Sequence, residues 1–185
     1  MIEKGWLVNA KIKKSPFFSP RADTDEVSLL VIHNISLPAG CFNTPYIDDL
    51  FLGKLDCSHD QTFNDLQNMQ VSAHCLIRRT GELIQYVSFE DKAWHAGVSL
   101  FKGRDKCNDF SIGIELEGCD DIPYTQQQYQ QLVKLTLSLQ QIYPEISREN
   151  IVGHCHIAPQ RKTDPGQSFD WQYFRASIYS YPLKK

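Results

Sequence analysis

The sequence predicts an α/β fold in which a central mixed β-sheet is flanked by α-helices. Short apolar or alternating segments, typical of strands, lie in the middle of the chain, and segments with helical spacing lie between and after them. The 185 residues contain no internal repeat, low-complexity tract or linker. We therefore expect a single domain over residues 1–185, large enough to bury a core without disulfides.

The predicted strands differ in their apolar pattern. Residues 28–33 (SLLVIH) are apolar up to the final histidine, as in a buried central strand. Residues 71–77 (VSAHCLI) and 83–87 flank Thr80-Gly81, a predicted hairpin turn. Residues 110–117 alternate with a period of two, which places four apolar side chains on one face and serine, glycine and two glutamates on the other.

Three segments are predicted to be helical. Over residues 125–143, Thr125 and Gln128 have the spacing of a capping box, and apolar residues recur at helical spacing up to a proline. A shorter helix is expected over residues 44–53, and another over residues 170–179. Helices between and after the strands are expected to pack on the faces of the sheet.

Composition excludes several classes of partner. The formal net charge is −3 and no lysine- or arginine-rich block occurs, so nucleic acid and anionic membrane are not expected partners. Nothing in the sequence indicates an obligate protein partner. The N-terminus lacks the apolar run of a signal peptide and no stretch reaches transmembrane length, so we expect a cytoplasmic protein. Its six cysteines include no Cys-x-x-Cys pair and are expected to be reduced and mostly buried.

Residues 154–166 (HCHIAPQRKTDPG) concentrate more reactive side chains than any other stretch. Two imidazoles, a thiol, two cations and a carboxylate lie within eleven positions. Two prolines and a terminal glycine predict a rigid loop rather than a helix. Such a loop suits a metal-assisted hydrolytic site, although a solvated loop rich in histidine is the alternative from this segment alone.

Three residues of the chain could together bind a catalytic zinc ion. His33 at the end of its strand, His154 and Asp164 would supply two nitrogens and one oxygen, and a fourth position would stay open for water. A core histidine bonded to the backbone is the alternative for His33.

The other histidines are weaker candidates. His156 lies two residues from His154, so in an extended loop it points elsewhere. His59 lies in a polar stretch and is expected to be solvated, whereas His74 or His95 could line a cleft.

A zinc-bound water needs a base, and strand 110–117 offers two. Glu115 and Glu117 share its polar face, and Glu115 is deeper in the strand and better desolvated. A solvent-facing edge strand is the alternative explanation. Lys162 could stabilise the negative charge that develops on a carbonyl oxygen during attack. These roles together describe metal-assisted amide hydrolysis.

Five blocks of the sequence, in this order, resemble the AmpD-type N-acetylmuramoyl-L-alanine amidases. The blocks are LLVIHNIS (29–36), VSAHCLIRRTGELIQYV (71–87), AWHAG (93–97), CNDFSIGIELEG (107–118) and GHCHIAPQRKTDPG (153–166). These enzymes belong to the zinc amidase family that also contains phage lysozyme amidases and peptidoglycan recognition proteins. The resemblance covers about residues 5–175 and implies a mixed sheet flanked by helices, with one zinc ion in a surface groove.

The resemblance also implies roles for individual residues. The zinc ligands of the family match His33, His154 and Asp164, the acid/base matches Glu115, and the transition-state cation matches Lys162. Asn34, Trp94 and Arg161 match positions that line the substrate groove of the family, and Lys106 stands where the family has arginine. Gln70 also stands at a position where arginine is expected. Neither glutamine nor lysine holds a carboxylate bidentately as arginine does. The binding of acidic groups of the substrate is therefore expected to differ from that in relatives with arginine at these positions.

The activity implied by the resemblance is hydrolysis of the amide between the lactyl group of 1,6-anhydro-N-acetylmuramic acid and L-alanine in soluble anhydro-muropeptides. A lytic enzyme acting on intact peptidoglycan and a non-catalytic muropeptide receptor are the alternatives. Residues 36–70 are either a surface insertion or a lid over the groove. Cys155 is either an inert loop thiol or a site of oxidative inactivation.

Overall fold

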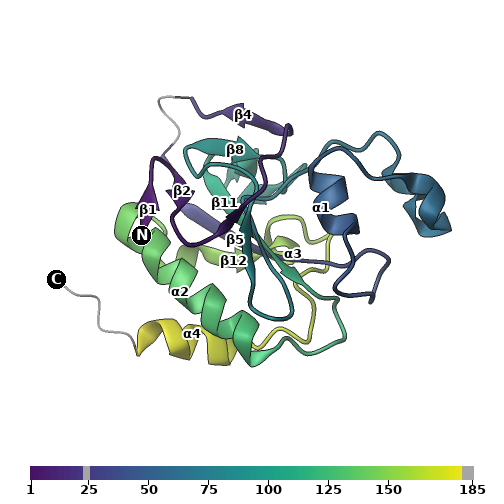
Figure 1. The fold of residues 1–185 in the computed structure, drawn as a ribbon. Coiled ribbons are helices and arrows are strands. Elements are labelled where there is room, and N and C mark those ends of the chain that lie inside the picture. Colours follow the sequence, from purple (N-terminus) through teal and green to yellow (C-terminus); the bar gives the residue numbers. More distant parts are fainter. Residues whose placement is uncertain (23–25, 181–185) are drawn as a thin grey trace.

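The computed structural model describes residues 1–22 and 26–180. Its main element is a six-stranded sheet in the order β12-β5-β11-β6-β7-β3. Strands β12, β5 and β11 of this sheet can be followed in Figure 1. In the order of the sheet, the strands are Ile151–Gly153, Leu29–Ile35, Ser111–Glu117, Cys75–Ile77, Leu83–Gln85 and Lys11–Ile12. The first four run parallel, β7 is antiparallel to β6, and β3 is parallel to β7, so the predicted mixed sheet is confirmed.

The remaining strands form three antiparallel pairs outside this sheet. They are β1 (Ile2–Glu3) with β2 (Trp6–Leu7), β4 (Phe18–Pro20) with β8 (Asp91–Ala93), and β9 (Leu100–Phe101) with β10 (Arg104–Asp105). The helices are α1 (Tyr46–Phe51), α2 (Gln126–Ile142), α3 (His154–Ile157) and α4 (Trp171–Tyr179), with 3-10 turns at Cys57–His59, Gln61–Leu66, Cys107–Asp109 and Arg148–Asn150. In the described part of the chain, no helix is both long and apolar enough to cross a membrane.

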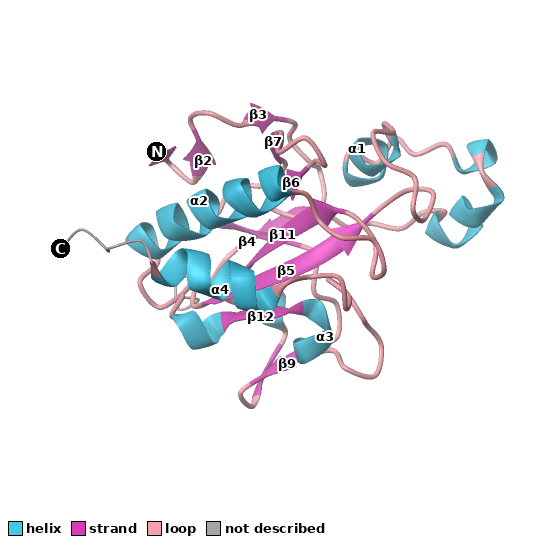
Figure 2. Cartoon of the chain, turned by 90° about the horizontal axis from the view of Figure 1, so that it is seen from below, coloured by secondary structure: helices cyan, strands magenta, loops and turns pink. Residues whose placement is uncertain are grey.

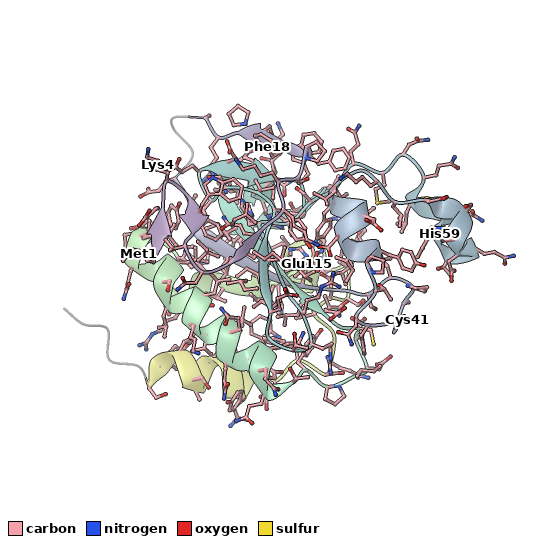
Figure 3. All side chains as sticks on the ribbon, in the orientation of Figure 1. Met1, Lys4, Phe18, Cys41, His59 and Glu115 are labelled. Atoms are coloured by element: carbon pink, nitrogen blue, oxygen red, sulfur yellow. The ribbon has the colours of Figure 1, made fainter. Side chains whose placement is uncertain are left out.

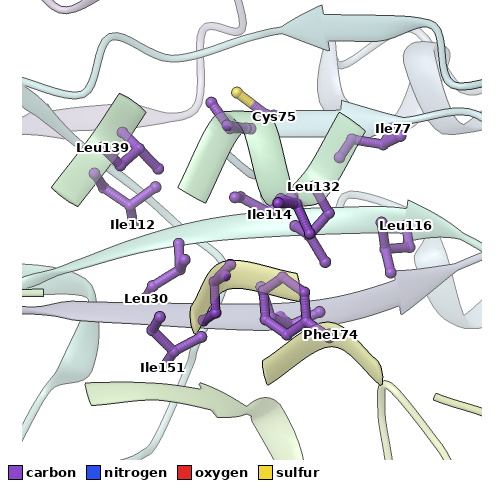
Figure 4. Packing of buried hydrophobic residues seen from close by; sticks show 14 of the residues in the cluster. Leu30, Cys75, Ile77, Ile112, Ile114, Leu116, Leu132, Leu139, Ile151 and Phe174 are labelled. Carbon is purple, nitrogen blue, oxygen red and sulfur yellow. The ribbon is translucent and has the colours of Figure 1, made fainter. Parts of the chain in front are cut away.

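Helices α2 and α4 lie side by side on one face of the sheet (Figure 2). The main core fills the space between them and the strands (Figure 4). Apolar side chains of β5, β11 and β6, including Ile32, Ile114 and Ile77, pack there against Leu132 of α2 and Phe174 of α4. Their removal from water is the main force that holds the helices on this face.

The opposite face of the sheet carries His33 of β5 and the two glutamates of β11, together with apolar side chains. One apolar cluster near the start of the strands includes Leu29 and Phe110, and another includes Ile47 of α1 and Leu76 of β6. The α1 cluster borders a surface groove that also contains Glu115 of β11. The face without large helices is therefore the one that holds the candidate site.

Most predicted elements are present with shifted ends. The strand predicted over 28–33 continues to Ile35, the predicted hairpin is β6–β7, and α2 begins with the capping box of Thr125 and Gln128. The alternative of a solvent-facing edge strand for 110–117 is wrong, because β11 lies between β5 and β6 and every residue of it is buried.

Two expectations need correction. Residues 154–166 are not loop throughout, because His154–Ile157 form one helical turn before the loop. The cysteines are all free, but only Cys75 and Cys107 are buried, and Cys41 is exposed. Cys75 lies within β6, whereas the four cysteines that are not buried lie outside the strands.

Candidate active site

Three donor atoms from distant parts of the chain meet at the end of the sheet. Nδ1 of His33 lies 3.0 Å from Nδ1 of His154 and 3.0 Å from Oδ2 of Asp164, and the last two atoms are 3.1 Å apart. Both histidines are buried, and Asp164 is half-buried. The predicted set of three therefore forms one compact cluster that could hold a metal ion.

Strand pairing explains how these residues meet. His33 lies near the end of β5, and His154 directly follows β12, the strand that pairs with β5. The backbone N–H of Cys155 donates to the carbonyl of Asp164 at 2.9 Å, which holds the loop end against the helical turn. Two neighbouring parallel strands and one loop contact thus bring together residues that are 121 and 131 positions apart.

The chemistry of this cluster fits a divalent zinc ion. Burial lowers the pKa of His33 to about 4, so its imidazole is neutral and carries a lone pair. Burial acts to raise the pKa of Asp164, but hydrogen bonds with His154 and His33 outweigh it and keep the pKa below its usual value, so the carboxylate is charged. Ligands around a tetrahedral zinc ion are about 3.3 Å apart, close to the spacing of these three atoms.

A buried carboxylate lies beside the cluster. Glu115 is paired with His33 across β11 and β5, and it is only 8% exposed. Its Oε2 atom has no hydrogen-bond partner among the residues that the structure describes. Burial raises the pKa of Glu115 well above its usual value, and the nearby charge of Asp164 acts in the same direction, whereas Lys162 opposes both. A carboxylate with a raised pKa is a stronger base than an exposed glutamate, as a general base requires.

The cluster and Glu115 open into a groove of about 300 Å³. Its polar lining includes Asn34 and Lys162, and Trp94 is on its wall. Apolar side chains from residues 36–70, among them Leu50 and Phe51 of α1, complete it. Figure 3 shows Glu115 near the middle of the molecule and His59 at the tip of the projecting 57–66 segment. That segment therefore helps to build the groove wall at its base and is exposed at its tip.

Residues 23–167 match the family described as N-acetylmuramoyl-L-alanine amidase. The chain belongs to this family. The amidase is 56% identical to the 1,6-anhydro-N-acetylmuramyl-L-alanine amidase AmpD of Salmonella typhimurium (strain SL1344), over 95% of this chain and 94% of the relative.

Solved structures show the same fold. The crystal structure of a selenomethionine AmpD derivative matches the amidase with a TM-score of 0.93 and 54% identity, over 96% of this chain and 99% of the other. The N-acetylmuramyl-L-alanine amidase AmiD of E. coli, solved with the substrate anhydro-N-acetylmuramic acid-L-Ala-D-gamma-Glu-L-Lys, matches with a TM-score of 0.60 and 31% identity, over 85% of this chain and 60% of the other.

Most of the residues predicted for the site line the groove of the amidase. They are His33, Asn34, Trp94, Glu115, His154, Lys162 and Asp164. The other two lie in adjoining cavities. Arg161 donates from Nη2 to the carbonyls of Ala96 and Val98, and Lys106 lines a cavity that shares Trp94 with the groove.

Gln70, His156 and His59, which the sequence also singled out, lie outside the groove. Gln70 lines a neighbouring cavity beyond Leu50. His156 turns away from the cluster, and its Nδ1 accepts the backbone N–H of Gly153 at 2.9 Å. The predicted direction of His156 agrees with the structure, but the reason is the helical turn and not an extended loop. His59 is exposed, as expected.

Sequence reasoning missed the partner of His33. Nε2 of His33 lies 2.9 Å from Nδ1 of His95, which lines the groove but was only one of two cleft candidates. Burial lowers the pKa of His95 well below its usual value. Gly113, in the middle of the polar face of β11, could have indicated this contact, because a glycine there leaves space for a neighbouring ring.

Sequence reasoning also missed a buried ion network behind Glu115. Arg78 donates to Oδ2 of Asp48 on α1 at 2.6 Å and to Oε1 of Glu117 at 2.9 Å. Tyr86 donates a short hydrogen bond to the same Asp48. The second glutamate of the polar face is therefore paired, which leaves Glu115 as the carboxylate of β11 that faces the groove.

Proposed function

We propose that this chain hydrolyses the amide between the lactyl group of 1,6-anhydro-N-acetylmuramic acid and L-alanine, with one zinc ion held by His33, His154 and Asp164. The proposal rests on the buried Oε2 of Glu115, which has no hydrogen-bond partner in the described part of the chain and lies beside three converging donors. The chain is also 56% identical to a 1,6-anhydro-N-acetylmuramyl-L-alanine amidase. The donor set of two imidazoles and one carboxylate is typical of catalytic zinc with an open position.

A zinc ion bound at these donors would lower the pKa of a water molecule toward neutrality and polarise a carbonyl oxygen. His33 and His154 contribute neutral lone pairs, and Asp164 contributes the one negative charge of the set. The low pKa of Asp164 keeps that charge in place at neutral pH. The residues of the cluster thus bind and orient, and they exchange no protons in the reaction.

Glu115 is the general base and then the general acid. Its Oε2 accepts the proton of the attacking water, and the same oxygen later returns it to the nitrogen of the leaving L-alanine. Burial raises the pKa of Glu115, which makes it a stronger base than an exposed glutamate and a competent proton donor in the second step.

Lys162 supplies the positive charge that the transition state needs. It lines the groove together with Glu115 and Asp164, and it is half-buried. As water attacks the lactyl carbonyl, negative charge develops on the carbonyl oxygen, and the ammonium group of Lys162 stabilises it. A cation that is partly removed from solvent interacts more strongly with such a charge than one in bulk water.

Small soluble anhydro-muropeptides are the substrate class that we propose, in the cytoplasm and in the recycling of peptidoglycan. The relative AmiD was solved with an anhydro-muropeptide, which supports a substrate of this chemistry. The net charge of −3 disfavours binding to an anionic polymer. Asn34 and Trp94 on the groove wall are placed to contact substrate, with Arg161 and Lys106 in the cavities beside it.

Mass spectrometry of reaction products tests bond, substrate and metal together. A soluble anhydro-muropeptide is incubated with the protein, with and without a chelator, beside a turbidity assay on purified sacculi. We expect release of the intact peptide stem from the soluble substrate, its loss with chelator and its return with added zinc. Faster clearing of sacculi than cleavage of the soluble fragment would favour a lytic enzyme, and binding without cleavage would favour a receptor.

A further inference from the structure

Four of the six histidines form one column of rings through the interior. The ring centroids are 4.4 Å apart from His154 to His33, 5.0 Å from His33 to His95, and 5.7 Å from His95 to His74. His33, His74 and His154 are buried, and His95 is half-buried. The first two rings carry the nitrogen donors of the proposed zinc site, and the third has no role in the reaction as proposed above.

In each of the two histidine donors, the nitrogen that faces away from the cluster is Nε2. These two nitrogens contact the consecutive residues Ala96 and His95. Nε2 of His154 lies 3.0 Å from the carbonyl oxygen of Ala96, an acceptor only. Nε2 of His33 lies 2.9 Å from Nδ1 of His95. A metal ligand needs its lone pair on the nitrogen that faces the metal, so in both rings the proton must be on Nε2. For His154 a carbonyl enforces this arrangement, but for His33 it depends on the tautomer of another histidine.

We propose that His95 is a positioning residue that holds His33 in the tautomer required for zinc binding. The inference rests on the proposed function, because it concerns the same metal site. The Nε2–H of His33 donates to Nδ1 of His95, so the proton of His95 is on its own Nε2. That nitrogen lies 3.1 Å from Oγ of Ser111, which accepts the hydrogen bond. Each nitrogen of the two rings then has a definite role.

Gly113 provides the space for this arrangement. A Cβ atom built on Gly113 would lie 2.4 Å from Cγ and 2.5 Å from Nδ1 of His95, much closer than atoms can approach. Its φ is outside the left-handed region, so the glycine is needed for space and not for an unusual backbone. The N–H of Gly113 donates to Nδ1 of His74 at 3.0 Å, which fixes the strand against the neighbouring ring.

The test measures zinc affinity, by competition with a chromophoric chelator, in three variants. His95→Leu removes the acceptor for His33, and His95→Asn keeps an amide oxygen near the position of Nδ1. Gly113→Ala leaves His95 in the chain but displaces its ring. We expect His95→Leu and Gly113→Ala to bind zinc about 10–100-fold more weakly, the usual loss for a partner of a metal ligand. His95→Asn is expected to recover most of the affinity, and exposed His59→Leu serves as the matched control.

A second measurement uses the unmutated zinc-loaded protein and does not depend on how variants fold. Nitrogen-15 chemical shifts of the imidazoles report which nitrogen carries the proton. We expect His33 and His95 both to be protonated on Nε2. A proton on Nδ1 of His95 would overturn the proposal, as would wild-type zinc affinity in His95→Leu or an equal loss in His95→Asn and His95→Leu.

These outcomes separate the positioning role from the proposed function. If the wild-type chain binds no zinc and cleaves no muropeptide, the proposed function itself is wrong. If it binds zinc and cleaves the substrate but His95→Leu is unchanged in affinity, only the role of His95 is wrong.

Discussion

Glu115 and His33 are register partners on adjacent parallel strands, so their side chains leave the same face of the sheet at the same level. This relationship places a desolvated carboxylate beside a candidate metal ligand without any loop to position it. Because both strands are buried in the middle of the sheet, the pair is rigid. Precise spacing between a base and a metal site is what proton transfer to an attacking water requires.

Replacing Glu115 with glutamine is expected to separate chemistry from metal binding. The amide keeps the shape of the side chain but cannot accept a proton, so kcat should fall by about 10²–10⁴. Zinc content, measured by elemental analysis, should stay at the wild-type level because Glu115 is not among the three donors. Turnover close to that of the wild type would remove Glu115 from its proposed role.

The same substitution is expected to stabilise the metal-free protein at neutral pH. The folded-state pKa of Glu115 is raised, so the folded state binds more protons than the unfolded state above about pH 4.5. The contribution of Glu115 to the free energy of unfolding of the wild type is fully present below pH 4.5 and is lost as the pH rises. Denaturant unfolding should therefore show Glu115→Gln gaining stability relative to wild type from pH 4.5 upward. A constant difference across this range would contradict the desolvation of Glu115.

Two histidines of the same helical turn offer a matched pair for the metal site. His154→Ala removes a donor, and the purified protein is expected to lack stoichiometric zinc. His156→Asn changes a ring that points away from the cluster, and zinc should remain. Elemental analysis after dialysis against buffer with trace zinc measures both. Equal zinc content in the two variants would show that His154 does not hold the metal.

Arg78→Met is expected to destabilise the fold strongly. The Arg78 side chain is 8% exposed, and it neutralises Glu117, which is fully buried, and Asp48. Removing Arg78 leaves the buried carboxylate of Glu117 without its opposite charge, at a cost of about 3–5 kcal/mol in the free energy of unfolding, whereas Asp48 keeps its ion pair with Lys13. The control is Lys11→Met in the exposed pair Lys11–Glu82, expected to cost at most about 1 kcal/mol. Similar losses in both variants would mean that burial does not govern the effect.

Acid sensitivity is expected from His74. Burial lowers its pKa to about 3, and the charge of Arg21 adds to the effect, so the folded state keeps the ring neutral. An unfolded histidine takes up a proton near pH 6.5, so stability from this group is present above that pH and is lost as pH falls toward 3. Wild-type stability should fall more steeply than that of His74→Gln between pH 6.5 and 4, by about 1.4 kcal/mol per pH unit. Parallel curves would contradict this prediction.

The sequence alone determined the features that depend on local chemistry and spacing. The capping box of Thr125, the period of strand 110–117 and the hairpin at Thr80-Gly81 follow from interactions between residues a few positions apart. The candidate ligands could be named because histidine and aspartate carry their chemistry wherever the chain places them, and because five sequence blocks resemble one family.

Only the tertiary structure decided which polar groups share an environment. The contact of His33 with His95 spans 62 positions, and that of Arg78 with Glu117 spans 39. Both depend on strand register and on which loop covers the open face of the sheet, and neither leaves a periodic trace in the sequence. Pairing on both sides of β11 likewise turned an apparently polar face into a buried one, and this burial raises the pKa of Glu115.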